Sequence, residues 1–274
     1  MNKLQNYKLR VTSYTLQVTG VAFCFLLSAF CFLPAALNAQ EMKMVTHLKN
    51  GSVIKTPIAT IDSITFSNQE DIEEGVVING IRWATRNVDA HGQFVANPED
   101  YGGYYQWGRR GDGHEQLTSA TTTTLSDTDT PPHGDFILVS DEPRDWRTPQ
   151  NDNLWGTTKT ANDPSPAGWR VPTYEELKSL TDTNYVTHVW TTENGVIGYR
   201  CTDKATGNFL FLPAAGVRYY SNGSFNYAGT YGHYWSSSPN GISADHLFFY
   251  SGSFHTNGSL YRAYGYSVRC VADE

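Results

Sequence analysis

Polar and apolar side chains alternate along two short stretches near the start of the chain. Residues 42–48 and 52–58 each predict a strand with one apolar face, and Asn50-Gly51 between them is a strong signal for a two-residue hairpin. A third short strand is predicted over 61–66. We therefore expect a small β unit over residues 40–66, which is too small to bury much apolar surface alone.

A second, longer part of the chain begins after a charged linker at 67–75. Residues 76–83 have the pattern of two short strands joined by an Asn-Gly turn. The clearest helical pattern spans 172–180, where Thr173 and Glu176 have the spacing of a capping box.

The rest of this part lacks extended helical periodicity. Residues 111–135 are rich in Gly, Thr, Asp and Pro and predict a long surface loop. Short strands separated by turn signals continue to the end of the chain. The pattern therefore predicts one domain over 76–274 with short strands, long loops and few helices.

The first 39 residues have the organisation of an export signal. Three cationic residues precede an apolar run at 21–33, and the small residue Ala39 suits cleavage before Gln40. The run is shorter than the roughly 20 residues of a membrane span, and a bulky Phe precedes both of its cysteines, unlike a lipoprotein signal. We expect a mature chain without a transmembrane span that is periplasmic, at the cell surface or extracellular.

Cleavage would make an acidic chain more acidic. The removed segment carries three cationic residues and no acidic one, so the formal net charge moves from −7 to −10. An acidic chain without a Lys/Arg-rich run is a poor candidate for binding nucleic acid or an anionic membrane. Aromatic residues make up 14% of the chain and charged residues only 17%, which favours a loop-rich β domain over a helical enzyme.

Two cysteines, Cys201 and Cys270, follow the predicted cleavage site. Because exported proteins meet an oxidising compartment, the sequence predicts a disulfide between them. The alternative is two free thiols that are buried separately.

No residue pattern typical of catalysis is present. The eight histidines lack the spacing of a metal site, no Gly-x-Ser-x-Gly motif occurs, and the glycines at 111–113 lack the strand-to-helix context of a phosphate loop. We therefore predict no catalytic residue, no metal and no cofactor. The aspartates of the acidic loop leave open a structural ion, although a solvated loop accounts for them better: Asp127, Asp129, Asp135 and Asp141.

An ordered set of short motifs runs through residues 76–272. It resembles a family of exported bacterial domains named for the major paralogous domain of Fibrobacter succinogenes. The motifs are Trp-Ala-Thr-Arg-Asn-Val at 83–88, the segments 97–107 and 162–173, Thr-Asp-Lys-Ala-Thr-Gly-Asn at 202–208, Phe-Leu-Pro-Ala-Ala-Gly at 211–216, Tyr-Trp-Ser-Ser-Ser at 234–238 and Gly-Tyr-Ser-Val-Arg at 265–269.

The resemblance implies an irregular α+β domain with a C-type-lectin-like fold, akin to the formylglycine-generating-enzyme branch. Its frame would be held by Trp83, Trp107, Trp169, Trp235 and the predicted disulfide. Two features of known branches are missing. No second cysteine flanks Cys270, as the copper site of those enzymes requires, and Glu142-Pro143-Arg144 places a cation where calcium-dependent lectins have a ligand.

The last 70 residues have an unusual composition. From Ala205 to Asp273 there is no Lys, Glu, Gln or Met, while 16 of the 37 aromatic residues fall there among Gly, Ser and Asn. Tyr with small polar residues is typical of adaptable binding surfaces. We predict that ligand binds there, on Tyr219, Tyr220, Asn240, Asp245, His246, Tyr250, His255, Asn257 and Tyr261.

Residues 239–264 also resemble the variable region of proteins that are diversified by retroelements. In such regions, substitution of adenines in Asn-type codons does not readily yield Lys, Glu, Gln, Met or Trp, and this segment has none. The depletion reaches upstream to residue 205, so codon randomisation does not account for all of it.

These observations lead to three functional hypotheses. The first is an exported, non-enzymatic recognition or adhesion module that binds a glycan or protein ligand at the cell surface. The second is a fimbrial or cell-surface structural subunit, and the third is an enzyme related to the formylglycine-generating branch.

Overall fold

The computed structural model describes residues 7–11, 14–18, 43–47, 53–57 and 75–273. The chain divides into two units, Met1–Ile72 and Glu73–Glu274. Within the described ranges, no helix combines the length and the apolar character needed to cross a membrane.

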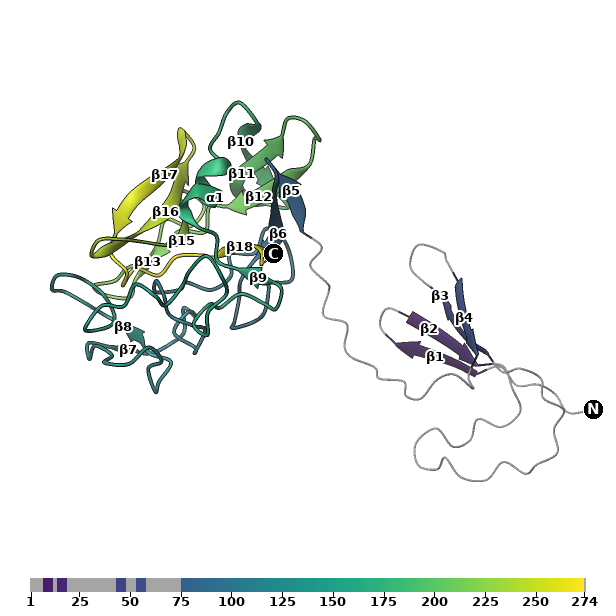
Figure 1. The fold of residues 1–274 in the computed structure, drawn as a ribbon, viewed down its shortest axis with the longest axis horizontal. Helices are drawn as coiled ribbons and strands as arrows, with labels where there is room; N and C mark the ends of the chain where they lie inside the picture. Colours follow the sequence, from purple (N-terminus) through teal and green to yellow (C-terminus); the bar gives the residue numbers. More distant parts are fainter. Residues whose placement is uncertain (1–6, 12–13, 19–42, 48–52, 58–74, 274) are drawn as a thin grey trace, which may run out of the picture. The chain divides into compact units, whose positions relative to one another are not determined.

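The smaller unit contains a four-stranded antiparallel sheet in the order β1-β2-β3-β4. Its strands are β1 (Tyr7–Val11), β2 (Tyr14–Val18), β3 (Lys43–His47) and β4 (Val53–Pro57) (Figure 1). The hairpin predicted around Asn50-Gly51 is present as β3 and β4, which pair in register from Lys43↔Pro57 to His47↔Val53. β1 and β2 lie inside the predicted export signal, and the predicted strand 61–66 lies outside the described residues.

The larger unit consists of short strands, long loops and one short helix in its described residues, as predicted. Its elements are β5 (Val76–Ile78), β6 (Ile81–Asn87), β7 (Thr121–Thr122), β8 (Phe136–Ile137), β9 (Trp169–Arg170), α1 (Tyr174–Ser179), β10 (Val186–Glu193), β11 (Val196–Asp203), β12 (Phe209–Pro213), β13 (Val217–Arg218), β14 (Phe225–Asn226), β15 (Gly232–Asn240), β16 (Ser243–Tyr250), β17 (Ser253–Leu260) and β18 (Arg269–Ala272).

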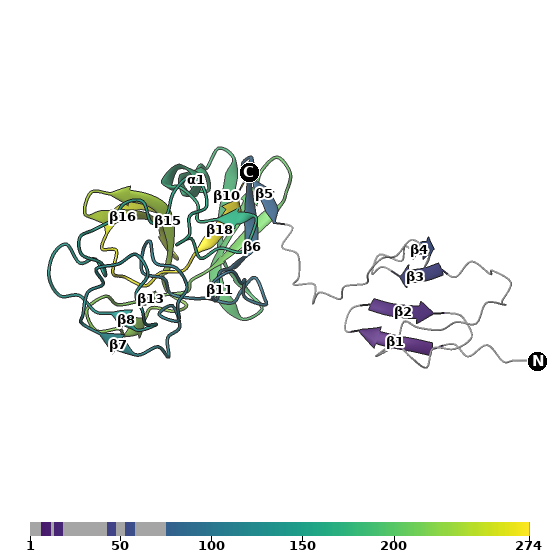
Figure 2. The same ribbon diagram turned by 60° about the horizontal axis from the view of Figure 1, so that its bottom comes forward.

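One sheet joins the two ends of this unit. In the order β5-β6-β18-β9, the last strand lies between the first strands and β9, with Val271 opposite both Trp83 and Arg170. β10-β11-β12 and β15-β16-β17 form two further antiparallel sheets. The loop-rich segment that carries β7 and β8 lies at the opposite end of the unit from α1 (Figures 1 and 2).

Local chemistry explains two of the elements that were predicted. The turn between β5 and β6 holds Asn79 and Gly80 at φ 48° and 79°, which are left-handed conformations that Asn and Gly adopt most readily. At the start of α1, Thr173 accepts a hydrogen bond from the backbone N–H of Glu176, whose side chain accepts one from the backbone N–H of Thr173. The predicted capping box is therefore present.

The core consists of separate clusters of buried side chains. The first lies among β5, β6, α1 and the sheets β10–β12 and β15–β17, and includes Trp83 and Phe249. The second includes Trp107, Trp169 and Trp235. All four tryptophans that were expected to hold the frame are therefore buried.

Four arginines are as deeply buried as the tryptophans: Arg109, Arg218, Arg262 and Arg269. Arg218 donates to the carbonyl oxygens of His114 and Gln116 at 3.1 and 2.8 Å, and to the hydroxyl of Ser119 at 2.7 Å. Its guanidinium also lies 4.2 Å from the centre of the Phe136 ring. Ser119 also donates to both carbonyls, through its backbone N–H to Gln116 and its hydroxyl to His114, so the planar guanidinium joins a hydrogen-bonded loop to β13.

The predicted disulfide is wrong. Cys201 and Cys270 are both free and fully buried. Cys201 belongs to the first core cluster and Cys270 to the second, where its Sγ lies 3.0 Å from the hydroxyl of Ser165. The two thiols therefore fill separate apolar sites, which is the alternative that the sequence left open.

We expect Arg218→Met to destabilise the larger unit by on the order of 3 kcal/mol, because several loop oxygens lose the hydrogen bonds that the guanidinium donates. Urea unfolding followed by tryptophan fluorescence measures this, since every Trp lies at or after position 83. Arg110→Met, which removes an exposed arginine, is the matched control. Equal unfolding midpoints for the two variants would show that the buried fork does not stabilise the loops.

Both thiols should resist alkylation in the native protein and react after unfolding without reductant. Burial raises the pKa of both cysteines well above its usual value, so neither forms a thiolate at neutral pH. Mass spectrometry of the two cysteine peptides after labelling in buffer and in urea gives the result. A linked Cys201–Cys270 peptide would contradict the structure.

Candidate functional site

Seven tyrosines from the C-terminal third of the chain form a continuous row of rings, which we call the tyrosine ladder. Its ring contacts run Tyr261, Tyr220, Tyr264, Tyr219, Tyr227, Tyr231 and Tyr250, with successive ring centroids 5.4, 4.7, 5.6, 6.4, 4.8 and 6.1 Å apart. Tyr261 and Tyr264 are also stacked at 6.2 Å, so the first three rings form a group in which each contacts the other two. Tyr227 and Tyr250 are 46% and 39% exposed and the others are half-buried. The ladder therefore presents ring surface and phenol groups to solvent.

Backbone hydrogen bonds hold the segments that carry these rings. The N–H groups of Thr230 and Tyr231 donate to the carbonyl of Tyr227, and Tyr219 donates to Ser224 across the β13–β14 turn. Tyr227 itself has φ 64°, a left-handed conformation that is uncommon for a residue with a side chain. The rings are therefore presented by fixed turns rather than by extended flexible loops.

The middle of the ladder rests on the core. Tyr264 stacks on the buried Tyr266 at a centroid distance of 5.4 Å, and Tyr266 lies 4.4 Å from Trp235. Burial raises the pKa of Tyr264 to about 12 and also raises that of Tyr219. Both phenols are therefore uncharged at neutral pH and act as hydrogen-bonding groups.

Arg144 covers one end of the ladder. Its guanidinium lies 4.4 Å from the ring centre of Tyr261 and 5.6 Å from that of Tyr220, within the range of cation–π attraction. The same guanidinium is 2.5 Å from the carboxylate of Glu142, so the end of the ladder carries a paired rather than a free charge.

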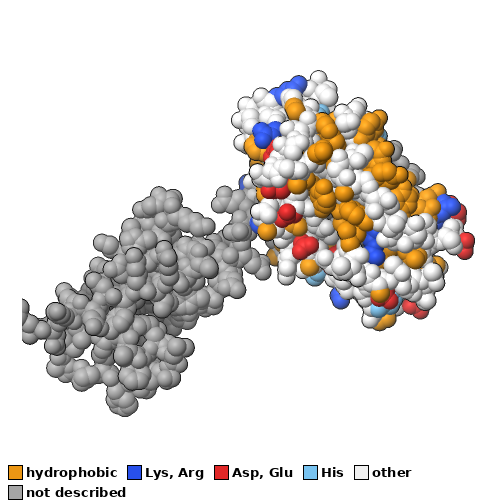
Figure 3. Space-filling view, turned by 180° about the vertical axis from the view of Figure 1, so that it is seen from behind, with side chains coloured by type: hydrophobic (Ala, Val, Ile, Leu, Met, Phe, Trp, Pro, Cys, Tyr) orange, Lys and Arg blue, Asp and Glu red, His pale blue; other side chains and the backbone are white. Residues whose placement is uncertain are grey.

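Phe248 extends the other end, with its ring 5.6 Å from Tyr231 and 5.5 Å from His255. Apolar side chains, tyrosine included, gather in a band that reaches the side of the domain where β15–β17 lie (Figure 3).

The structure brings together five of the nine predicted ligand-binding residues. Tyr219, Tyr220, Tyr250 and Tyr261 belong to the tyrosine ladder, and His255 lies beside its Phe248 end. Asn240 is exposed, but its amide donates to Asp245 at 2.8 Å. The side chain of Asn257 lies outside the described part of the structure.

Two predicted ligand-binding residues are buried, so the expectation that they are exposed is wrong. His246 is 0% exposed and Asp245 is 9% exposed. Both lie on β16, a strand that is covered on its two faces: Leu247 packs in the first core cluster and Ala244 in the second. His246 lies within ring-contact distance of Trp235 and Tyr266 and belongs to the support beneath the ladder.

Sequence reasoning did not select Arg144 or Phe248 for this surface. Arg144 counted only as an argument against calcium, because it lies 76 positions before Tyr220 and 117 before Tyr261, the two tyrosines that it covers. Tyr227, Tyr231 and Tyr264 were not among the nine predicted residues, although their places beside turns in the same tyrosine-rich region already argued against a core position.

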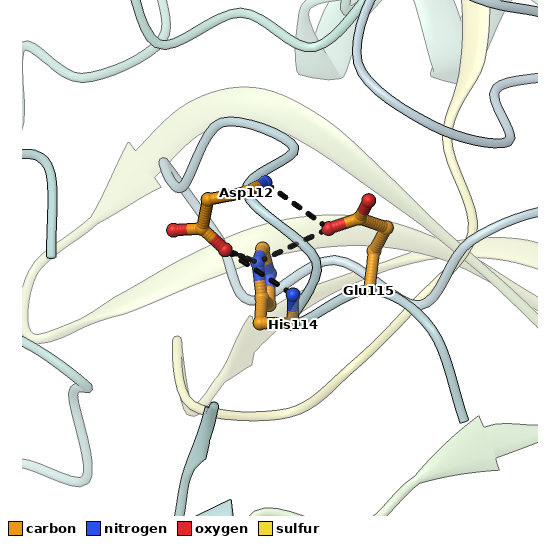
Figure 4. A group of neighbouring side chains, drawn as sticks. All are labelled: Asp112, His114 and Glu115. Atoms are coloured by element: carbon orange, nitrogen blue, oxygen red, sulfur yellow. Dashed lines mark hydrogen bonds and ion pairs between the residues drawn. The ribbon is translucent and has the colours of Figure 1, made fainter. Parts of the chain in front are cut away.

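A second cluster of polar side chains consists of Asp112, His114 and Glu115, whose ligand atoms lie within 4.8 Å of one another (Figure 4). The protein already uses these atoms. The Nε2 of His114 accepts from the backbone N–H of Gln106 at 3.1 Å, so Nδ1 carries the proton and donates to Asp112 at 2.8 Å.

The carboxylates of this cluster are engaged in the same way. Asp112 also accepts from Arg109 at 2.9 Å, and Glu115 accepts from the backbone N–H groups of Asp112 and Gly113. A metal ion would have to displace these bonds, so the geometry fits a hydrogen-bonded brace of the loop better than a metal site.

A comparison of the chain with models of protein families, with curated proteins and with solved structures found no match.

Two buried histidines make stability depend on pH. Burial lowers the pKa of His114 to about 4 and that of His233, which stacks on Tyr266, to about 3. In the unfolded chain both titrate near 6.5. Between these values the unfolded state binds more protons, so the folded state loses stability as pH falls from about 6.5 towards 4.

We expect His233→Phe to reduce this loss, because an aromatic ring remains in the stack while the titrating group is removed. The slope of unfolding free energy against pH should decrease by on the order of 1 kcal/mol per pH unit between pH 6 and 4. Urea midpoints measured across this range test it, with the surface variant His133→Gln as the control. An unchanged slope would mean that His233 is not held neutral by burial.

Proposed function

We propose that this protein is an exported recognition or adhesion module that binds a glycan or protein ligand on the tyrosine ladder. The observation that carries the proposal is the ladder itself, an unbroken row of partly exposed rings. Tyrosine provides a large contact area with few rotatable bonds to restrict, and its hydroxyl adds a hydrogen bond at the rim.

A C-type-lectin-like fold over residues 76–274 is part of this proposal. Its support is the ordered motif set, together with two features of the structure: β18 pairs with β6 and so joins the two ends of the domain, and much of the remaining chain is loop. Since this fold carries enzymes as well as binding proteins, it does not by itself select a function.

A non-enzymatic role has separate support. The most concentrated group of titratable side chains that we identified is the one around His114, and its ligand atoms are engaged by the protein's own hydrogen bonds. The histidine in ring contact with a ladder tyrosine, His233 against Tyr231, is buried, and burial lowers its pKa to about 3. The feature that sets this surface apart from the rest of the domain is therefore its aromatic contact area and not a reactive group.

We expect Tyr250→Ala and Tyr261→Ala each to weaken ligand binding by about 1–3 kcal/mol while leaving the fold intact. Tyr185→Ala is the matched control, because Tyr185 is a 58% exposed tyrosine that has no ring contact with the ladder. Binding of the labelled protein to a glycan array and to immobilised cell-surface extract gives the affinities. Ladder variants that bind as well as the Tyr185→Ala control would disprove the proposed function.

A further inference from the structure

The tyrosine ladder lies in a segment that is almost without charge. Between Tyr219 and Tyr261 the only Asp, Glu, Lys or Arg is Asp245, which is nearly buried and accepts from Asn240. The neighbouring arginines Arg218 and Arg262 are buried. At the Arg144 end, the cation is paired with Glu142.

This neutrality restricts the ligand. Anionic polymers and strongly charged peptides bind where unpaired opposite charges attract them, and residues 219–261 contribute no exposed charged side chain to the ladder. The rings of this row are all tyrosines, with Phe248 beside them, so most of them offer a flat apolar face together with a hydroxyl group. The ligand must therefore be uncharged and present apolar patches and hydroxyl groups together.

An uncharged polysaccharide has this chemistry. The C–H faces of its sugar rings pack on aromatic rings, and its hydroxyl groups exchange hydrogen bonds with phenols. The ladder also connects separate segments: the Arg144 loop, the β13–β14 turn and the end of β16 are joined through successive ring contacts. A row of this kind is suited to a chain of sugars rather than to a single one.

The platform is formed before the ligand arrives. Tyr227 is held in a left-handed conformation, and its carbonyl accepts from both Thr230 and Tyr231. Tyr264 donates through its backbone N–H to the carbonyl of Tyr261 at 3.1 Å. Little conformational entropy is then lost on binding, which favours a ligand whose individual contacts are weak.

We propose that the ligand of the tyrosine ladder is an uncharged polysaccharide chain laid across its rings. This proposal rests on the recognition function proposed above. Tyr227 and Tyr250, the most exposed members of the row, are its main stacking platforms.

Affinity electrophoresis of the full chain in native gels tests the assignment, with mixed-linkage β-glucan, xylan, mannan and dextran as neutral probes and alginate and polygalacturonate as charged ones. At least one neutral probe should retard the protein. The retardation should persist between about 0.1 and 1 M NaCl, where charge interactions are screened. Retardation by the charged probes alone, or by none of the probes, would overturn the assignment.

Variants then locate the site. Tyr227→Ala and Tyr250→Ala should each raise the Kd for the neutral probe about tenfold. Tyr227→Phe should retain most of the affinity because it keeps the ring. The control Tyr185→Ala should bind like the parent. Unfolding midpoints confirm that each variant is folded. If the Ala variants and the parent bind the neutral probe with equal affinity, the ladder is not the glycan-binding site.

Treatment of the cell-surface extract separates this inference from the proposed function. Periodate, which cleaves sugar diols, should abolish ladder-dependent binding, whereas protease should not. The reverse result would disprove the polysaccharide assignment while leaving recognition through the ladder in place. If ladder variants bind the untreated extract as well as the parent does, the proposed function itself fails.

Discussion

The structure depends on how a domain with little regular secondary structure satisfies its buried backbone carbonyls. Arg109 donates to the carbonyls of His133 and Asp135, and Arg262 to those of Ser243 and Gly241. Indole N–H groups do the same, as Trp107 donates to Ser236 and Trp235 to Tyr105. Since an unpaired buried carbonyl costs on the order of 1–3 kcal/mol, these donors allow long loops to pack as a core.

The same constraint positions the tyrosine ladder. Arg218 and Gly265 exchange two backbone hydrogen bonds, N–H to carbonyl in each direction, at 3.0 and 2.9 Å. Tyr219 follows the first of these residues and Tyr264 precedes the second, so the bridge sets the 5.6 Å separation of their rings. A side chain at position 265 would meet Arg218 and Phe136 within about 3 Å. The surface is therefore built on the buried arginine that holds the loop beneath it.

Features that depend on residues close together in the sequence were predicted correctly. Features that depend on packing between distant segments were not. The Asn79-Gly80 turn and the Thr173–Glu176 capping box depend on neighbours in sequence, and both are present. The predicted Cys201–Cys270 bond failed because it relied on compartment and cysteine number, whereas burial in two separate clusters depends on packing. His246 was misplaced for a similar reason, since only the tertiary structure shows that β16 is covered on both faces.

The distribution of charge reverses the usual arrangement, because four arginines lie in the interior while tyrosines occupy the candidate binding surface. The arginines are tolerated inside because each guanidinium, which is weakly hydrated for a cation, donates to backbone carbonyls. Carboxylates also pair with Arg109 and Arg262, and an aromatic ring lies against each of Arg109, Arg218 and Arg262. Because Arg218 and Arg262 are buried, the segment between them presents no exposed charged side chain. Association with a ligand then gains little from electrostatic steering, so its rate should depend weakly on salt and its strength should come from ring contact and fixed geometry.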